Sequence, residues 1–212
     1  MFKKSVIYAI AGLLILFNFI YAEAFFDDKP QIRYKYTFRI EDRRDHRKLY
    51  LQRLSSVFTC RDSNDDNFFK LEPFFEIRRN LNADLWQRKE LGLEIGRDIF
   101  DWLYLGESVQ KLWRNEDYQH YKSFKKRDTA ELETRLLFSH DLIAKDSFKM
   151  MGYILNEYTY DLRDGRATSN EISLGVTFPI HKYIEAGLNW RHIDRIHYYD
   201  SDNLEISATL VF

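Results

Sequence analysis

The strongest constraint on the fold of this chain is a strict alternation of apolar and polar side chains. From Gln31 to Glu41 every even position is Ile, Tyr or Phe, and every odd position is polar or charged. The segment Leu204 to Phe212 repeats this pattern and finishes on an aromatic residue. Successive side chains of a β-strand point to opposite faces, so this period of two predicts strands with one apolar and one polar face.

The same alternation recurs between these two segments and predicts a sheet of many strands. Five further segments alternate clearly: 69–78, 90–96, 130–138, 171–178 and 184–191. Three others, 46–58, 102–113 and 148–162, are long and rich in aromatic and aliphatic residues, but their alternation slips, which we attribute to β-bulges. We therefore predict ten strands, with eight or twelve as alternatives.

The first 24 residues have the layout of a secretory signal peptide. Lys3 and Lys4 precede an apolar stretch from Val6 to Tyr21, and Ala22-Glu23-Ala24 supplies small residues for cleavage. A retained membrane anchor is the alternative, but the stretch is shorter than the roughly 20 residues of a membrane helix. We predict a cleaved signal peptide at 1–24 and a single domain at 25–212.

Composition excludes several classes of protein. The formal net charge of the whole chain is −1 and becomes more negative without Lys3 and Lys4, which argues against nucleic acid as a partner. The mean hydropathy of −0.50 and the lack of another long apolar run exclude a helical membrane protein. Cys60 has no second cysteine to pair with and is interpreted as an incidental loop thiol.

The fold class indicated is all-β, an antiparallel up-and-down transmembrane β-barrel. A soluble barrel with its apolar face inward is the alternative, and the aromatic residues near strand ends and the charged polar faces favour the membrane. With its signal peptide, alternating strands and terminal Phe212, the chain resembles the small bacterial outer-membrane β-barrel proteins as a class. The resemblance implies export through the periplasm to the bacterial outer membrane, with lipid, lipopolysaccharide and the barrel-assembly machinery as partners.

An even strand count returns the carboxy-terminus to the same side of the membrane as the amino-terminus, so the connections divide into two sets. The predicted periplasmic turns are 60–67, 97–101, 140–147 and 179–182. The predicted outer loops are 42–45, 79–85, 114–128, 163–167 and 195–202, and they include the longest connection.

If the apolar face meets lipid, the polar face lines the barrel with charges of both signs. Opposite charges in a narrow barrel would form ion pairs and plug it, while the alternative is a narrow channel that selects small solutes by size and sign. The residues predicted to line the lumen are Arg33, Lys35, Arg39, Glu72, Glu76, Arg78, Glu90, Glu94, Glu131, Glu133, Arg135, Glu171, Glu185, Arg191 and Glu205.

The histidines of the penultimate strand and its loop suggest a competing hypothesis, a lipid-active hydrolase. His192 should face lipid where outer-membrane lipid A deacylases carry a His and a Ser two residues later, but Asp194 stands at that second position and Glu205 should face inward. A serine-hydrolase triad therefore lacks both its nucleophile and its acid. The sequence favours a non-enzymatic structural or surface protein, or a narrow passive pore.

The remaining candidates are surface contacts. His192 and His197 are suited to meet lipopolysaccharide headgroups at the membrane interface. The basic run Lys122, Lys125, Lys126 and Arg127 lies in the longest outer loop and could bind lipopolysaccharide phosphates. The sequence indicates no cofactor, no metal site and no catalytic residue.

Overall fold

The computed structural model describes residues 30–42, 47–61, 67–82, 84–114, 128–145, 148–196 and 200–212. The predicted signal peptide lies outside these described residues, so it stays a prediction. In the described ranges no helix has the length and apolar character needed to cross a membrane.

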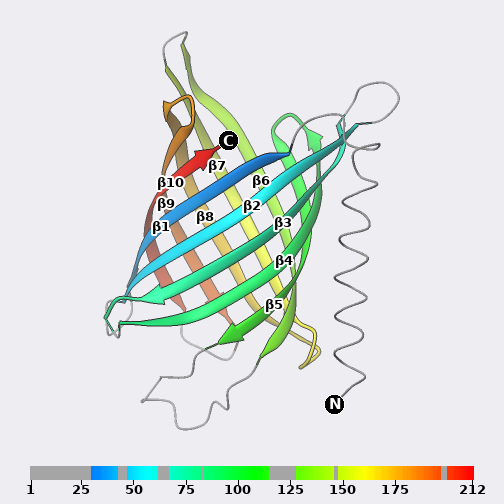
Figure 1. Ribbon diagram of the computed structural model, residues 1–212, viewed down its shortest axis with the longest axis vertical. Helices are drawn as coiled ribbons and strands as arrows, with labels where there is room; N and C mark the ends of the chain where they lie inside the picture. Colours follow the sequence, from blue (N-terminus) through cyan, green and yellow to red (C-terminus); the bar gives the residue numbers. More distant parts are fainter. Residues whose placement is uncertain are drawn as a thin grey trace.

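Ten β-strands form a closed barrel, shown in Figure 1. Each strand pairs antiparallel with its neighbours in the chain, and β1 closes the sheet against β10. Closure leaves no strand with an unpaired edge, which confirms the predicted antiparallel up-and-down barrel and its ten strands. The strands are β1 (Gln31–Asp42), β2 (Lys48–Arg61), β3 (Asn67–Asn80), β4 (Leu85–Phe100), β5 (Leu103–Arg114), β6 (Thr129–Lys145), β7 (Phe148–Asp161), β8 (Arg166–His181), β9 (Ile184–Arg195) and β10 (Ser201–Val211).

Several strands are longer than the alternation predicted. The segment 140–147 is wrong as a predicted turn, because β6 continues to Lys145 and β7 begins at Phe148. In this part of the hairpin β6 and β7 pair only with each other, because neither β5 nor β8 extends as far. It projects above the other strands in Figure 1. Segments 97–100 and 179–181 are likewise strand, because their backbone groups continue the hydrogen-bonded ladder.

Local chemistry explains the tight turn between β7 and β8. The Asp161 carboxylate accepts hydrogen bonds from the backbone N–H groups of Arg163 and Asp164, at 2.8 and 3.0 Å. Gly165 closes the turn with a φ of 64°, in the left-handed region that glycine adopts without steric cost. Its N–H donates to the Asp161 carbonyl at 2.9 Å, so this four-residue connection needs no further support.

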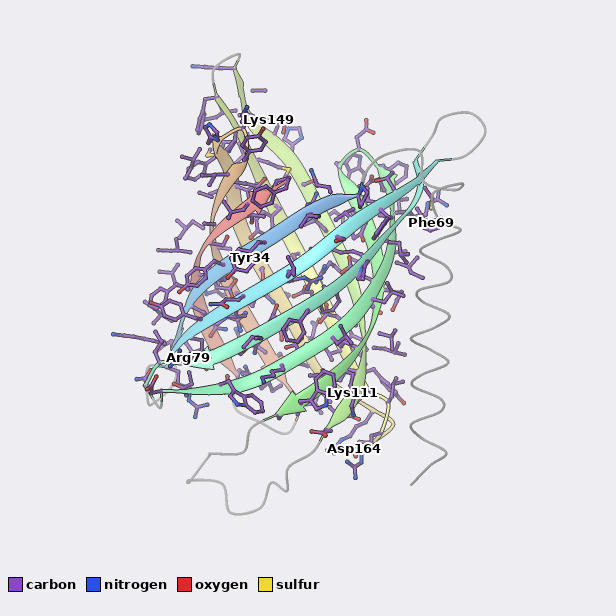
Figure 2. The ribbon with its side chains drawn as sticks, in the orientation of Figure 1. Tyr34, Phe69, Arg79, Lys111, Lys149 and Asp164 are labelled. Carbon is purple, nitrogen blue, oxygen red and sulfur yellow. The ribbon has the colours of Figure 1, made fainter. Side chains whose placement is uncertain are left out.

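We call the two ends of the barrel the loop end and the terminal end. The loop end carries the long connection between Arg114 and Thr129, and the terminal end carries Gln31 and Phe212. In Figure 2 the labels of Arg79, Lys111 and Asp164 mark the loop end, and those of Phe69 and Lys149 mark the terminal end. The barrel interior therefore has a loop half and a terminal half.

The outward face of the barrel is apolar and exposed. Its exposed side chains include Leu54, Leu91, Ile154, Leu188 and Ile206, which come from strands all around the barrel. Aromatic side chains gather near both ends of this face. Near the terminal end Trp102 stacks between Phe100 and Phe138, with ring centroids 5.2 and 6.0 Å apart, and near the loop end Tyr50 contacts Tyr36 and Phe38.

The position of Cys60 differs from the sequence interpretation. It lies in β2 and is buried, so it is not a loop thiol. Its pairing partner in β3 is Phe69.

Candidate functional site

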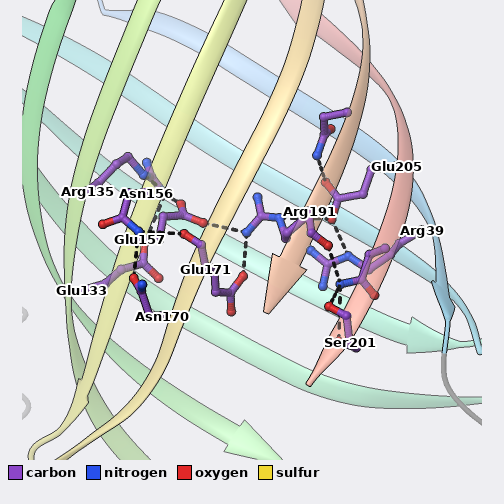
Figure 3. Close-up of polar contacts among 12 residues, drawn as sticks. Arg39, Glu133, Arg135, Asn156, Glu157, Asn170, Glu171, Arg191, Ser201 and Glu205 are labelled. Atoms are coloured by element: carbon purple, nitrogen blue, oxygen red, sulfur yellow. Dashed lines mark hydrogen bonds and ion pairs between the residues drawn. The ribbon is translucent and has the colours of Figure 1, made fainter. Parts of the chain in front are cut away.

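An ion-pair belt runs around the inside of the barrel at mid-height. Nine strands contribute a charged member, and β5 contributes Tyr104, whose hydroxyl donates to Glu94 at 2.7 Å. Figure 3 shows part of this belt. The ion-pair belt consists of Arg39, Arg53, Glu72, Glu94, Glu133, Arg135, Glu157, Glu171, Arg191 and Glu205.

On one side of the belt, Arg191 is the central cation. Its guanidinium lies 2.6 Å from Glu157, 2.7 Å from Glu171 and 3.4 Å from Glu205. Glu205 also pairs with Arg39 at 2.5 Å and accepts a hydrogen bond from the Asn189 amide at 3.0 Å. The Arg39–Glu205 pair joins the first and last strands, so closure of the barrel completes this part of the belt.

On the other side, Arg135 is the central cation. It lies 2.5 Å from Glu94, 2.8 Å from Glu157 and 3.2 Å from Glu133. Both halves of the belt therefore meet at Glu157, which pairs with Arg135 and Arg191. A charge buried this deeply is tolerated when several partners compensate the loss of its hydration.

Arg53 continues the belt across β2, β3 and β4. Its guanidinium lies 3.3 Å from Glu72 and 3.7 Å from Glu94, and it stacks over the Phe74 ring at 3.8 Å. Phe74 fits there because Gly92 on β4 has no side chain; a Cβ on Gly92 would lie 2.3 Å from the ring. This close approach explains a glycine in the middle of a strand.

The belt follows the barrel wall. Each of its ion pairs joins residues of the same strand, of adjacent strands or of strands two apart, for example Arg135 on β6 with Glu94 on β4. Strands on opposite sides of a ten-stranded barrel are five apart, so none of these pairs bridges its full width. The belt therefore links neighbouring strands of the wall and does not itself cross the interior.

The loop half of the interior is packed. Leu49, Leu112 and Ile193 have exposed fractions of 0%, 0% and 2%, and they come from β2, β5 and β9, which lie on three sides of the barrel. A second group of ion pairs lies among them. Arg88 pairs with Glu90 and, at 3.6 Å, with Glu131; Arg114 lies 2.5 Å from Glu131; Arg78 lies 3.5 Å from Glu76.

The terminal half is hollow. A cavity of about 770 Å³ extends from the belt towards the terminal end, with Glu72, Glu94 and Arg135 of the belt in its lining. Arg33, Lys70, Asp98, Asp101 and Tyr104 line it as well. Its wall is therefore built mainly from polar and charged side chains, with Val57, Leu103 and Leu137 as its apolar members.

The strand register puts all the predicted lumen residues on the face that carries the belt, because directly paired residues share a face. Arg33, Lys35 and Glu185 are exposed, although they are on this inward face. Their roles stay predictions. The inward charges outside the predicted list include Arg53, Arg88, Arg114 and Glu157.

In the described residues, an acid lies beside His192, as the hydrolase hypothesis requires, but no nucleophile contacts it. His192 faces outward, and its Nδ1 lies 3.0 Å from the Asp202 carboxylate, so the acid expected to be missing is present on β10. Glu205 faces inward and belongs to the belt, as its parity predicted. The contacts resolved for the His192 side chain are with Asp202 and the Trp190 ring, and none is with a hydroxyl or thiol that could attack an ester.

The other predicted surface contacts stay predictions. Lys122, Lys125, Lys126, Arg127 and His197 lie outside the described residues. Within the described ranges, no group of three or more His, Cys, Asp or Glu side chains is arranged to hold a metal ion.

Comparisons with known proteins concern the fold. Neither protein-family models nor curated proteins match this chain. Among solved structures, the β domain of the Bordetella autotransporter Brka aligns with a TM-score of 0.50 at 10% identity, over 87% of this chain and 100% of that one. The chain has the fold of outer-membrane β-barrel proteins.

Two other outer-membrane barrels align less closely. The KdgM porin, solved in complex with disordered oligogalacturonate, has a TM-score of 0.44 at 10% identity and covers 86% of this chain and 99% of its own. Outer membrane phospholipase A from Escherichia coli has a TM-score of 0.43 at 10% identity, with coverages of 84% and 92%. A shared fold does not establish a shared function.

Proposed function

We propose that the protein is an integral outer-membrane barrel without catalytic activity, whose interior is closed to free diffusion. The observation that carries this proposal is the packing of the loop half. Leu49, Leu112 and Ile193 are almost fully buried on three sides of the interior, with ion-paired arginines and glutamates between them. Small barrels of about eight strands are filled by their side chains in a comparable way.

The membrane location is supported by the outward face. It carries exposed apolar side chains on every side and aromatic rings near both ends, which is the arrangement that matches a hydrocarbon core between two interfaces. The proposed structural or surface role is supported by the rigidity that the ion-pair belt would give to the barrel wall. An ion-pair belt with a member in nine strands, with Tyr104 from β5 attached to it, suits a structural or surface protein.

A planar-bilayer recording tests the closed interior. We expect the wild-type chain, reconstituted into a bilayer, to give no discrete conductance steps at moderate voltages. Insertion is verified separately by the heat-dependent mobility shift of the folded barrel extracted from the same membranes. Regular ion-selective steps from inserted wild-type protein would overturn the proposal and support the narrow pore.

A further inference from the structure

Two cations on β1 stand apart from the ion pairs of the interior. Arg33 and Lys35 face inward, yet neither forms an ion pair with a carboxylate of the described residues. The Arg33 Nε donates to the Gln31 side chain at 2.8 Å, which leaves its two terminal nitrogens available. Both side chains are exposed, whereas Arg39 on the same face is buried against Glu205.

Arg33 lines the cavity of the terminal half. At about 770 Å³ this cavity is within the range of roughly 300–1,000 Å³ typical of small-molecule sites. Most of its carboxylates already have a cation: Glu72 pairs with Arg53, Glu94 with Arg135, and Asp98 with Lys70 at 2.6 Å. Asp101, in the turn between β4 and β5, is at the rim.

The strand pairing places Lys35 beside a second cation, because its direct partner on β2 is Arg53. Its partner on β10 is Thr209, which pairs in turn with Glu185 of β9, so one exposed carboxylate lies on the same face. The other nearby carboxylate, Glu205, is already paired with Arg39 and Arg191. Low-dielectric walls concentrate the field of such charges in the cavity, which favours entry of an anion.

We propose that the terminal half of the barrel interior binds a small oxyanion, a carboxylate or a phosphate, through Arg33 and Lys35. The two residues are two positions apart on one face, so their backbones are separated by about 7 Å along the strand. The guanidinium can bind two oxygens of the ligand side by side, and the ammonium adds a mobile positive charge. Only the path of the ligand rests on the proposed function: if the loop half is closed, the ligand enters and leaves at the terminal end.

Isothermal titration calorimetry on the full chain, folded in detergent micelles at low ionic strength, tests this site. The probes are inorganic phosphate and, in a separate titration, citrate. We expect saturable binding of at least one probe with a stoichiometry near one, and at least a tenfold loss of affinity in the double variant Arg33→Gln/Lys35→Gln. The charge-retaining variant Arg33→Lys/Lys35→Arg should bind within a few-fold of the wild type.

A matched control removes the same charge from the same end outside the cavity. Arg97 and Lys145 are exposed near the terminal end. Arg97 is on the outward face of β4, and Lys145 is in the part of the β6–β7 hairpin that extends beyond the other strands. Arg97→Gln/Lys145→Gln should leave the affinity unchanged, and each variant must keep the heat-dependent mobility shift. Equal weakening in this control, or no saturable binding of either probe by the wild type, would overturn the site. Bilayer conductance does not enter this test, so a barrel that conducts and still loses binding in the double variant would refute the closed interior alone.

Discussion

The two halves of the barrel interior are built from the same ten strands but differ in how their side chains fill the space. In the loop half, side chains from three sides of the barrel are buried, and Leu49 and Leu112 have no exposed surface. In the terminal half, the wall is polar and surrounds a cavity of about 770 Å³. The difference shows that strand number does not decide by itself whether a barrel is filled, because the same ten strands leave one half of the interior packed and the other hollow.

The ion-pair belt is the boundary between these halves, so breaking it should have the largest effect on stability. Arg135→Gln would leave Glu94, Glu133 and Glu157 without their shared cation in a buried setting. Removal of one partner from a buried ion pair typically costs about 3–5 kcal/mol. We expect a loss of this size in the free energy of unfolding, measured by urea titration in detergent with tryptophan fluorescence.

The control for this variant is Arg79→Gln. Arg79 pairs with Asp84 at 2.6 Å, but both side chains are more than half exposed. Exposed pairs contribute about 0–1 kcal/mol, so this variant should unfold close to the wild type. Equal costs for the two variants would show that the belt is not a stabilising boundary.

Removing a buried leucine from the loop half should cost somewhat less and should also open the interior. Leu112→Ala creates a cavity in a packed region, at a cost of about 2–5 kcal/mol. The double variant Leu49→Ala/Leu112→Ala should give conductance steps in planar bilayers. Leu137→Ala, in the lining of the existing cavity, should cost clearly less and stay silent. If the two leucine sites behave alike in both measurements, the contrast between the halves is wrong.

The smallest predicted effect is the difference in stability cost between removing one hydroxyl from the loop half and removing one from the terminal half. Thr129 in the loop half is buried and donates to Asp161 at 2.8 Å, so Thr129→Val leaves a carboxylate oxygen without its donor, at about 1–3 kcal/mol. Tyr104 in the terminal half donates to Glu94, but its hydroxyl borders the cavity, where water can replace it. Tyr104→Phe should therefore cost less than Thr129→Val in the same urea titration. The reverse order would indicate that the cavity is dry.

The architecture was predictable because most strands keep apolar residues on one face. Strands such as Gln31–Asp42 and Ser201–Val211 show the period directly, and from them the ten strands, the sides of the connections and the inward faces follow. The extent of the hairpins was not predictable, because residues 140–145 pair with their own hairpin partner after the rest of the sheet has ended. The extension is seen only in the backbone pairing between β6 and β7.

The charged residues that the sequence reasoning missed lie mostly on strands where apolar residues also face inward and polar residues also face outward. On β2 the inward residues include Leu49 and Leu51, while Gln52 faces outward, so the polar face could not be recognised and Arg53 was overlooked. On β5 the inward Leu112 has the same effect beside the outward Lys111. Bulges do not explain the slips at Leu49 and Leu112, because the β1–β2 and β5–β6 pairings run without a register shift. Register shifts do occur in the pairings of β7, opposite Met150 and Met151 and between Thr159 and Tyr160. The apolar side chains buried in the loop half interrupt the polar inward pattern, so the charged residues next to them were not recognised from the sequence.

The Arg39–Glu205 pair has a consequence for how the barrel is completed. These residues are 166 positions apart in the chain and become neighbours when β10 joins β1. A polypeptide that ended before β10 would hold the Arg39 guanidinium in the interior without its closest counter-charge, a penalty of about 3–5 kcal/mol on top of the open sheet edge. The pair thus acts as a check of completeness, since an unfinished copy is less stable than a finished one at the position where the ring must close.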